Sequence, residues 1–253
     1  MRPICPLCMT SASVGFQCPD CVGAGAAQQR QPVTPVGAPI KEKPTVTYVL
    51  IAVNVAIFGL AWMSGLDEAI GNWGMWPAGI AQGEWWRLFT SAFLHGGFLH
   101  ILFNMYILFI VGAPLERLMG HLRFGVLYVA AAFGGAVASY AFNPVNTLSV
   151  GASGAIFGLM GAFAVAGFKM RYDIKQILFL VGFNLVLGFV LAGTDWKAHV
   201  GGLITGVLVA AVFFYAPRNK RTVVQVLGVL VVLGILVGIT MWRTSELLAL
   251  PVY

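Results

Sequence analysis

The residues with the clearest potential for chemistry are a serine and a histidine, Ser153 and His199, each beside glycines in an apolar stretch. A serine hydroxyl becomes a useful nucleophile when a neighbouring base takes its proton, and histidine is the usual base. Two more polar residues, His100 and Asn104, are four positions apart, which puts them on one helix face. The four side chains would suit acyl transfer, in which hydrogen-bond donors stabilise an oxyanion.

The surroundings of Ser153 favour the same chemistry. It lies in Gly151-Ala-Ser-Gly154, at the expected start of a helix, where first-turn N–H groups have no intrahelical partner. Gly151 would let a substrate backbone approach closely. A packing role is the alternative for each motif alone, because small residues are usual at membrane helix contacts. His199 alone would also suit a proton relay or a metal or haem ligand.

The composition assigns these residues to a membrane protein. Of 253 residues, 59% are hydrophobic and 9% are charged, whereas about 25% are charged in soluble proteins. The net charge of +6 is spread thinly and forms no basic patch, so nucleic-acid binding is not predicted. The N-terminus lacks the apolar run of a signal peptide, and no cleavage is expected.

Seven apolar stretches are each close to the roughly 20 residues that cross a bilayer. We predict an all-α polytopic transmembrane bundle, because lipid-exposed backbone must satisfy its own hydrogen bonds. A six-helix core occupies residues 45–217, and a seventh helix lies in residues 218–253. The stretches are about 45–64, 98–116, 124–142, 150–168, 174–191, 198–216 and 223–241. The fifth is the weakest, since Asn184 and three glycines interrupt it.

Loop charges predict the orientation. With a cytoplasmic N-terminus, all Lys and Arg except Arg87, Lys197 and Arg243 lie on the cytoplasmic side, as the positive-inside rule favours. We therefore expect a multi-pass protein of the plasma membrane. The second, fourth and sixth helices then begin at the outer face, which puts Ser153 and His199 at one shallow depth. His121 falls in the inner loop after the second helix and is interpreted as an ordinary loop residue.

Several motifs together resemble the rhomboid family of intramembrane serine proteases, over roughly residues 45–216. They are Trp85-Trp86-Arg87 with His95, His100-Ile-Leu-Phe-Asn104, Glu116-Arg117, Gly151-Ala-Ser153-Gly154 and Ala198-His199-Val-Gly-Gly202. The resemblance implies that Ser153 is the nucleophile and His199 the base. It also implies an oxyanion site formed by His100, Asn104 and the Ser153 N–H.

Other family positions are supporting ones. Trp86 and Arg87 would lie in a membrane-embedded first loop, as structural residues. Phe157 stands where some relatives have Tyr; it could pack on the His199 ring but could not donate a hydrogen bond. The family uses a Ser–His dyad, so Asp195, four residues before His199, is not taken as a third member.

The implied activity is endopeptidase cleavage of single-span membrane proteins within the bilayer, near its outer side, without a catalytic cofactor. A non-catalytic relative that binds membrane clients is the main alternative, although such relatives typically lose the serine or histidine. A transporter or haem protein using His95, His100 and His199 is disfavoured, since the sequence has no internal repeat.

All four cysteines lie near the N-terminus, in Cys5-Pro-Leu-Cys8 and Cys18-Pro-Asp-Cys21. Paired CxxC motifs of this kind typically hold a structural tetrahedral zinc ion. Iron, redox and disulfide roles are alternatives, but disulfides rarely persist in the cytoplasm. We predict a zinc-binding segment at residues 1–24 that docks a cytoplasmic partner or steadies the N-terminus. Residues 25–44, rich in Gly, Ala, Gln and Pro, are predicted to be a flexible linker.

Overall fold

The computed structural model describes residues 8–28, 32–190 and 194–249. The chain divides into two compact units, Met1–Val33 and Thr34–Tyr253. In the first unit, the short strands β1 (Thr10–Ser11) and β2 (Phe16–Gln17) pair antiparallel and are followed by helix α1 (Pro19–Gln28). Gly15 turns the hairpin with a φ of 74°, a conformation that glycine adopts without strain.

The second unit is a helical bundle. Its long helices are α2 (Thr45–Ser64), α8 (His121–Phe142), α9 (Ser153–Met170), α10 (Lys175–Val190), α11 (Trp196–Tyr215) and α12 (Arg221–Ala249). One further span, Phe98–Met119, consists of α6 (Phe98–Ile107), a π-helical stretch η3 (Leu108–Gly112) and α7 (Ala113–Met119). Pro114 is the second residue of α7, two positions after the π-helical stretch, and its missing N–H interrupts regular helical pairing.

The observed spans follow the predicted ones, with two differences. Among the described residues, six helices are long and apolar enough to cross a membrane, and the chain is a multi-pass membrane protein. The fifth predicted span forms the shorter helix α10, whose described apolar part is Lys175–Val186. The seventh helix extends to Ala249, beyond the predicted end near residue 241, and carries an Arg243–Glu246 ion pair in its last turns.

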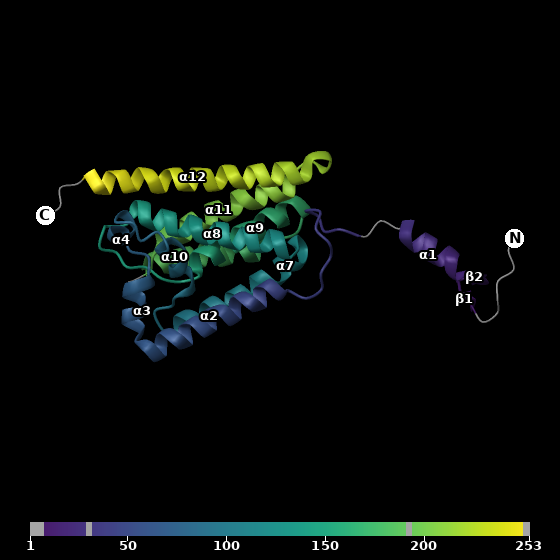
Figure 1. Cartoon of the computed structure of the whole chain (residues 1–253), viewed down its shortest axis with the longest axis horizontal. Helices are drawn as coiled ribbons and strands as arrows, with labels where there is room; N and C mark the ends of the chain where they lie inside the picture. Colours follow the sequence, from purple (N-terminus) through teal and green to yellow (C-terminus); the bar gives the residue numbers. More distant parts are fainter. Residues whose placement is uncertain (1–7, 29–31, 191–193, 250–253) are drawn as a thin grey trace. The chain divides into compact units, whose positions relative to one another are not determined.

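Three helices form the centre of the bundle. In Figure 1, α8, α9 and α11 lie between α2 and α12. Glycines let these helices approach closely: an added Cβ on Gly202 of α11 would lie 1.9 Å from the carbonyl oxygen of Gly154 on α9. One on Gly206 would lie 2.1 Å from the carbonyl oxygen of Gly158. The two small-xxx-small pairs therefore pack against each other, as membrane helix contacts often do.

The connection between α2 and α6 is a folded loop with four short helices. These are α3 (Leu66–Trp73), α4 (Pro77–Ala81), α5 (Arg87–Thr90) and the 3-10 turn η2 (Ser91–Phe93). Arg87 is buried in this loop and donates 2.9 Å hydrogen bonds to the carbonyl oxygens of Gly71 and Gly74. It also pairs with Glu84. The Arg87 guanidinium therefore links the end of α3 to the turn that precedes α5.

A buried carboxylate joins three spans at the other end of the bundle. Glu116 accepts hydrogen bonds from the N–H groups of Val46 and Thr47 (2.8 and 2.7 Å) and from the Thr47 hydroxyl (2.7 Å). It thus caps the first turn of α2. His121 is the first residue of α8, not a loop residue, and its Nδ1 lies 2.5 Å from Glu116 Oε1. The interpretation of His121 as an ordinary loop residue is wrong.

The segment before α2 is packed rather than flexible over part of its length. The predicted linker, residues 25–44, overlaps the end of α1, and Val36 and Ala38 are buried against the bundle. Gln225 of α12 donates to the carbonyl oxygens of Val36 (3.2 Å) and Phe213 (3.0 Å). The apolar side chains at 36 and 38 outweigh the Gly- and Pro-rich composition, because burying them removes apolar surface from water.

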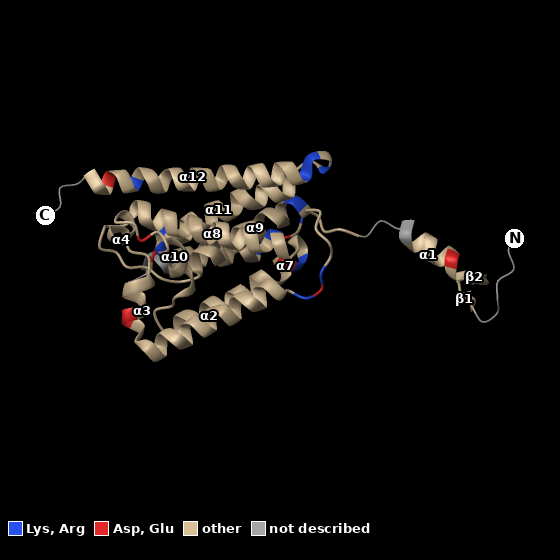
Figure 2. Cartoon of the chain, viewed as in Figure 1, with Lys and Arg blue, Asp and Glu red and all other residues tan. Residues whose placement is uncertain are grey.

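Basic residues gather at one end of the bundle (Figure 2). They lie where α7 and α9 end and where α12 begins. Arg87, Lys197 and Arg243, the three cations predicted to lie outside, belong to segments at the other end, beside the starts of α9 and α11. The helix directions therefore put the start of α9, with Ser153, at the end remote from most of the cations.

Candidate active site

A serine and a histidine from two adjacent helices meet at the candidate site. Ser153 is the first residue of α9, and His199 lies in the first turn of α11. Their Oγ and Nε2 atoms are 2.9 Å apart, a hydrogen-bond distance. This is the pairing in which an imidazole nitrogen can accept the hydroxyl proton. The residues lie 46 positions apart in the chain, and the close packing of α9 on α11 brings them together.

The His199 ring is held by stacking rather than by a third polar residue. Phe157, one turn after Ser153, stacks on the ring with centroids 4.3 Å apart and planes 18° apart. The Nδ1 atom of His199 is buried and has no hydrogen-bond partner among the residues the structure describes. The arrangement is therefore a pair, and the aromatic contact restricts the ring orientation.

The loop before α9 is fixed to the first loop by backbone hydrogen bonds. Met75 and Ser149 exchange two of them (2.9 and 3.0 Å), and the Gly151 N–H donates to the Ser91 carbonyl oxygen (2.9 Å). The Gly151 N–H is thus engaged in this loop contact. The site requires glycine at this position for two reasons. Its φ of 134° is a conformation that other residues rarely adopt, and a Cβ there would lie 2.8 Å from His100 Nε2.

His100 presents a donor beside Ser153. Its Nδ1 accepts a hydrogen bond from the Gly96 N–H (3.2 Å), so we assign the proton to Nε2. The position that a Gly151 Cβ would occupy is 2.8 Å from this Nε2 and 3.6 Å from Ser153 Oγ, which locates His100 across a narrow gap from the serine. The first-turn N–H groups of α9 begin at Ser153, and they have no partner within the helix.

Asn104 and His95 both contact His100. Asn104 donates its side-chain N–H to the His100 carbonyl oxygen (2.9 Å), and within the described residues it makes no hydrogen bond to Ser153. His95 is fully buried, with its ring edge-on to that of His100 at 5.2 Å. Burial lowers the pKa of His95 to about 3, and repulsion from His100 adds to this shift, so its ring is neutral at pH 7. Trp86 is half-exposed on the first loop.

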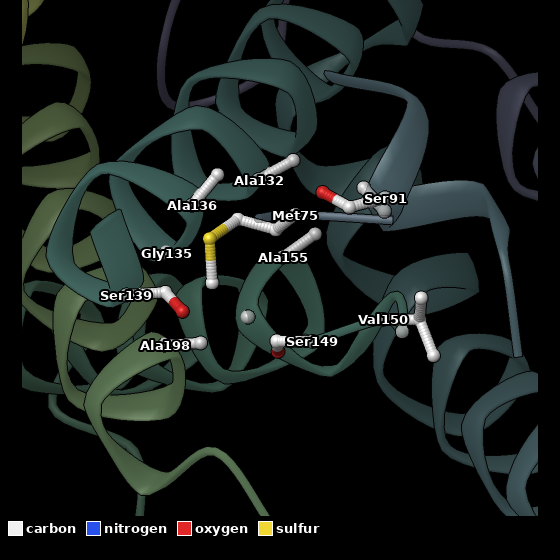
Figure 3. Close-up of a pocket in the computed structure, with 13 residues that line it drawn as sticks. Met75, Ser91, Ala132, Gly135, Ala136, Ser139, Ser149, Val150, Ala155 and Ala198 are labelled. Atoms are coloured by element: carbon white, nitrogen blue, oxygen red, sulfur yellow. The ribbon is translucent and has the colours of Figure 1, made fainter. Parts of the chain in front are cut away.

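A small cavity lies beside the pair, between the first loop and helices α8, α9 and α11. Figure 3 shows Ser91, Ser139 and Ser149 around it, together with Met75 and Ala198. Its volume is about 20 Å³, which has room for one water molecule but not for a side chain. This cavity therefore does not have room for a substrate peptide.

A polar network fixes the start of α11. Asp195 is the N-cap of this helix and accepts from the Ala198 N–H (3.1 Å). Its other carboxylate oxygen accepts from the Ser139 hydroxyl and from the Asn143 amide (3.0 Å), both on or next to α8. His199 follows in the first turn. Asp195 thus positions the helix that carries the histidine and does not bond to its ring.

Replacing Asp195 by alanine is expected to lower stability and site reactivity together. The loss of an N-cap costs about 0.5–2 kcal/mol, and two buried donors lose their acceptor as well. Asp195→Asn keeps a capping oxygen and is expected to have a smaller effect. The melting temperature in detergent measures the loss of stability, and the rate of fluorophosphonate labelling measures the loss of reactivity. A melting temperature of Asp195→Ala equal to that of the unsubstituted protein would contradict the role of this network.

The polar network around Asp195 and the hydrogen-bond donors to Glu116 were not predicted from the sequence. Ser139 and Asn143 have the i, i+4 spacing of one helix face, but that spacing does not name Asp195 as their partner. The sequence indicates Glu116 only as part of the Glu116-Arg117 motif. An isolated acidic residue in an apolar helix is a usable signal, because a buried carboxylate requires donors.

A polytopic helical bundle with a Ser–His pair in the first turns of two packed helices defines a narrow class of membrane protein. The Rhomboid domain family matches residues 82–216, which is more than half of the chain. The chain belongs to the rhomboid family.

Several rhomboid proteins are similar to this chain. Rhomboid protease GluP of Bacillus subtilis (strain 168) is 40% identical over 178 residues, which cover 67% of this chain and 35% of GluP. RHOMBOID-like protein 4 of Arabidopsis thaliana is 41% identical over 142 residues, covering 53% of this chain and 36% of that protein. Rhomboid protease AarA of Providencia stuartii is 27% identical over 210 residues, covering 70% and 74%. The chain thus spans about a third of the length of GluP.

Proposed function

We propose that the chain is an intramembrane serine endopeptidase that cleaves transmembrane segments of membrane proteins with Ser153 and His199. The observation that carries the proposal is the 2.9 Å contact between Ser153 Oγ and His199 Nε2 at the ends of two membrane-spanning helices. Two of the similar proteins are named rhomboid proteases, which supports the same activity. The function of a non-catalytic client-binding protein is not favoured, because this pair would serve no purpose in it.

The proposed reaction proceeds in two stages. His199 Nε2 takes the Ser153 proton as Oγ attacks the peptide carbonyl carbon, and the imidazolium then protonates the leaving amine. The oxyanion accepts hydrogen bonds from the Ser153 N–H and from His100 Nε2–H. Water then attacks the acyl-enzyme, with His199 again acting as base. Asn104 contributes by holding the His100 backbone and offers its second amide hydrogen to the site.

The proposed substrates are single-span membrane proteins, cut close to the outer surface of the plasma membrane. The distribution of cations supports a cytoplasmic N-terminus, because Lys and Arg are retained on the cytoplasmic side. Ser153 then lies at the outer end of α9, where hydrolytic water is available. A substrate helix must unwind there, since a peptide bond within a helix has its carbonyl engaged.

A serine-directed fluorophosphonate probe tests the proposal. Purified protein in detergent is expected to react with the probe, Ser153→Ala is expected not to react, and the nearby control Ser149→Ala should retain labelling. Labelling that persists in Ser153→Ala, or no labelling of folded unsubstituted protein, would overturn the assignment. Cleavage is measured by comparing new protein termini in membranes of cells that express the unsubstituted protein or Ser153→Ala.

We also propose that the N-terminal cysteines hold a structural zinc ion. Four thiolates are a donor set that suits zinc, and the β1–β2 hairpin lies between the two CxxC pairs, as in compact zinc-binding segments. Cys8, Cys18 and Cys21 are free thiols, and Cys5 lies outside the described residues. Within the described part, no three His, Cys, Asp or Glu residues are grouped as a metal site. A cytoplasmic partner of this segment is part of the same proposal.

Metal analysis of the purified chain tests the zinc ion. The unsubstituted protein is expected to contain about one zinc per chain, and Cys5→Ser and Cys18→Ser are expected to lose most of it. Ser149→Ala serves as a matched control outside the segment. Equal zinc content in all four proteins would exclude a site at these cysteines.

A further inference from the structure

An open apolar groove runs along the membrane-facing side of α8. Its volume is about 450 Å³, and its lining from His121 to Ala130 is almost entirely apolar. Leu233 of α12 closes one side. On the other side, Gly125 faces Val46 at the start of α2, since a Cβ on this glycine would lie 4.0 Å from Val46 Cγ1. The groove therefore lies on α8 between two flanking helices.

The helices α8 and α12 run parallel, which fixes where the groove begins. Arg123 bonds to Gln225 (2.9 Å) near the start of both helices, and Tyr140 bonds to Thr244 (2.7 Å) near their ends. At 1.5 Å per residue, the segment of α8 from His121 to Ala130, which contains the lining residues, extends for about 13 Å. Its mouth is level with Arg123, at the end of the bundle where basic residues gather.

Two arginines near the start of the groove, Arg123 and Arg221, have no acidic partner in the described part of the chain. The guanidinium groups of Arg123 and Arg221 are close enough for their charges to repel. No Asp or Glu in the described part of the chain lies within salt-bridge distance of either. The Nε of Arg221 is buried, and none of the residues that the structure describes forms a hydrogen bond with it. Arg221 also packs against Gly37, where any Cβ would lie 2.3 Å from Nη1.

Unpaired charges at the edge of the hydrocarbon layer are unfavourable unless an anion accompanies them. Glu116, beside the groove-lining His121, is already engaged with that histidine and with the N–H groups of Val46 and Thr47, and within the described residues it forms no ion pair with either arginine. The apolar groove starts within one turn of α8 from Arg123. A ligand that satisfies both features carries a negative headgroup and a long apolar tail. Guanidinium groups bind phosphate oxygens well, because their N–H donors form paired hydrogen bonds.

We propose that an anionic phospholipid binds this groove, with its phosphate between Arg123 and Arg221 and one acyl chain along α8 from Leu122 to Ala130. The site lies at the end of α8 remote from Ser153 and does not depend on the proposed protease activity. The lipid would brace α12 and the segment before α2 against α8, because Gln225 and Gly37 belong to the same cluster.

Lipid binding to the purified full chain tests the site. We expect native mass spectrometry in detergent to retain phosphatidylglycerol at least ten times more strongly than phosphatidylcholine. The double variant Arg123→Gln, Arg221→Gln should lose this preference. Lys175→Gln removes one cation from the same end of the bundle, away from the groove, and should keep it. Equal retention of the two lipids by the unsubstituted protein would overturn the proposal.

The groove is tested separately by filling it. Gly125→Leu adds a side chain in open space, with no backbone closer than van der Waals contact, so it should fold and lower retention of both lipids. Melting temperatures identify any variant that does not fold. If the double arginine variant does not fold, Gly125→Leu and the comparison of the two lipids decide the question. Unchanged retention in Gly125→Leu would overturn the placement of the acyl chain.

Discussion

Replacing His199 by alanine is expected to lower the rate at which Ser153 reacts with a fluorophosphonate by about 10²- to 10⁴-fold, the range that a positioned base contributes. The His199 ring is the base in hydrogen-bond contact with the serine hydroxyl, at 2.9 Å. His100 presents a protonated Nε2 toward the site, since its Nδ1 already accepts from Gly96, and so cannot replace it. The measurement is the second-order labelling rate of purified protein at pH 7.

Two substitutions of Phe157 serve as controls for this result. Phe157→Tyr keeps a ring stacked on His199 and is expected to change the labelling rate little. Phe157→Ala removes the stacking partner 4.3 Å from the ring and is expected to lower the rate by about tenfold, because an unrestrained base spends less time in the reactive orientation. Labelling of His199→Ala at more than a tenth of the unsubstituted rate would show that another group activates Ser153.

The helical bundle could be predicted from the sequence because lipid restricts spanning segments to long apolar helices. Six of the seven predicted stretches form helices long enough to cross the membrane, counted over the described residues. The loop charges and helix directions also predicted that Ser153 and His199 would lie at one level. Their pairing needed only that α9 and α11 be neighbours, and the glycines of both motifs favour such contact.

The remaining features depend on contacts between helices whose relative rotation a single sequence does not specify. The Gly151 N–H donates to the Ser91 carbonyl oxygen, sixty residues earlier, and no motif in the sequence indicates this contact. Val36 and Gln225 belong to segments that look respectively like a linker and an isolated helix, and their contact becomes visible only when both pack on α8 and α11. Buried polar groups are therefore better indicators of such contacts than apolar periodicity is.

The glycines that pack α9 against α11 belong to the same two motifs that carry Ser153 and His199, so helix spacing and the distance within the pair depend on one contact. An alanine at Gly202 would place its Cβ 1.9 Å from the Gly154 carbonyl oxygen, about 1.5 Å short of ordinary van der Waals contact. The oxygen belongs to the backbone, so α9 and α11 must separate. Overpacking of this kind costs about 1–3 kcal/mol.

Gly202→Ala is therefore expected to lower the melting temperature and to reduce Ser153 labelling of the folded protein by about 10²-fold, since a shift of 1 Å at a catalytic pair has this effect. Gly238→Ala in α12 is the matched control, because apart from its own helix backbone no atom of the described residues lies within 4 Å of the added Cβ. That substitution should keep labelling and leave stability equal or slightly higher, as alanine favours helix. Full labelling of folded Gly202→Ala would mean that the spacing of α9 and α11 does not set the Ser153–His199 distance.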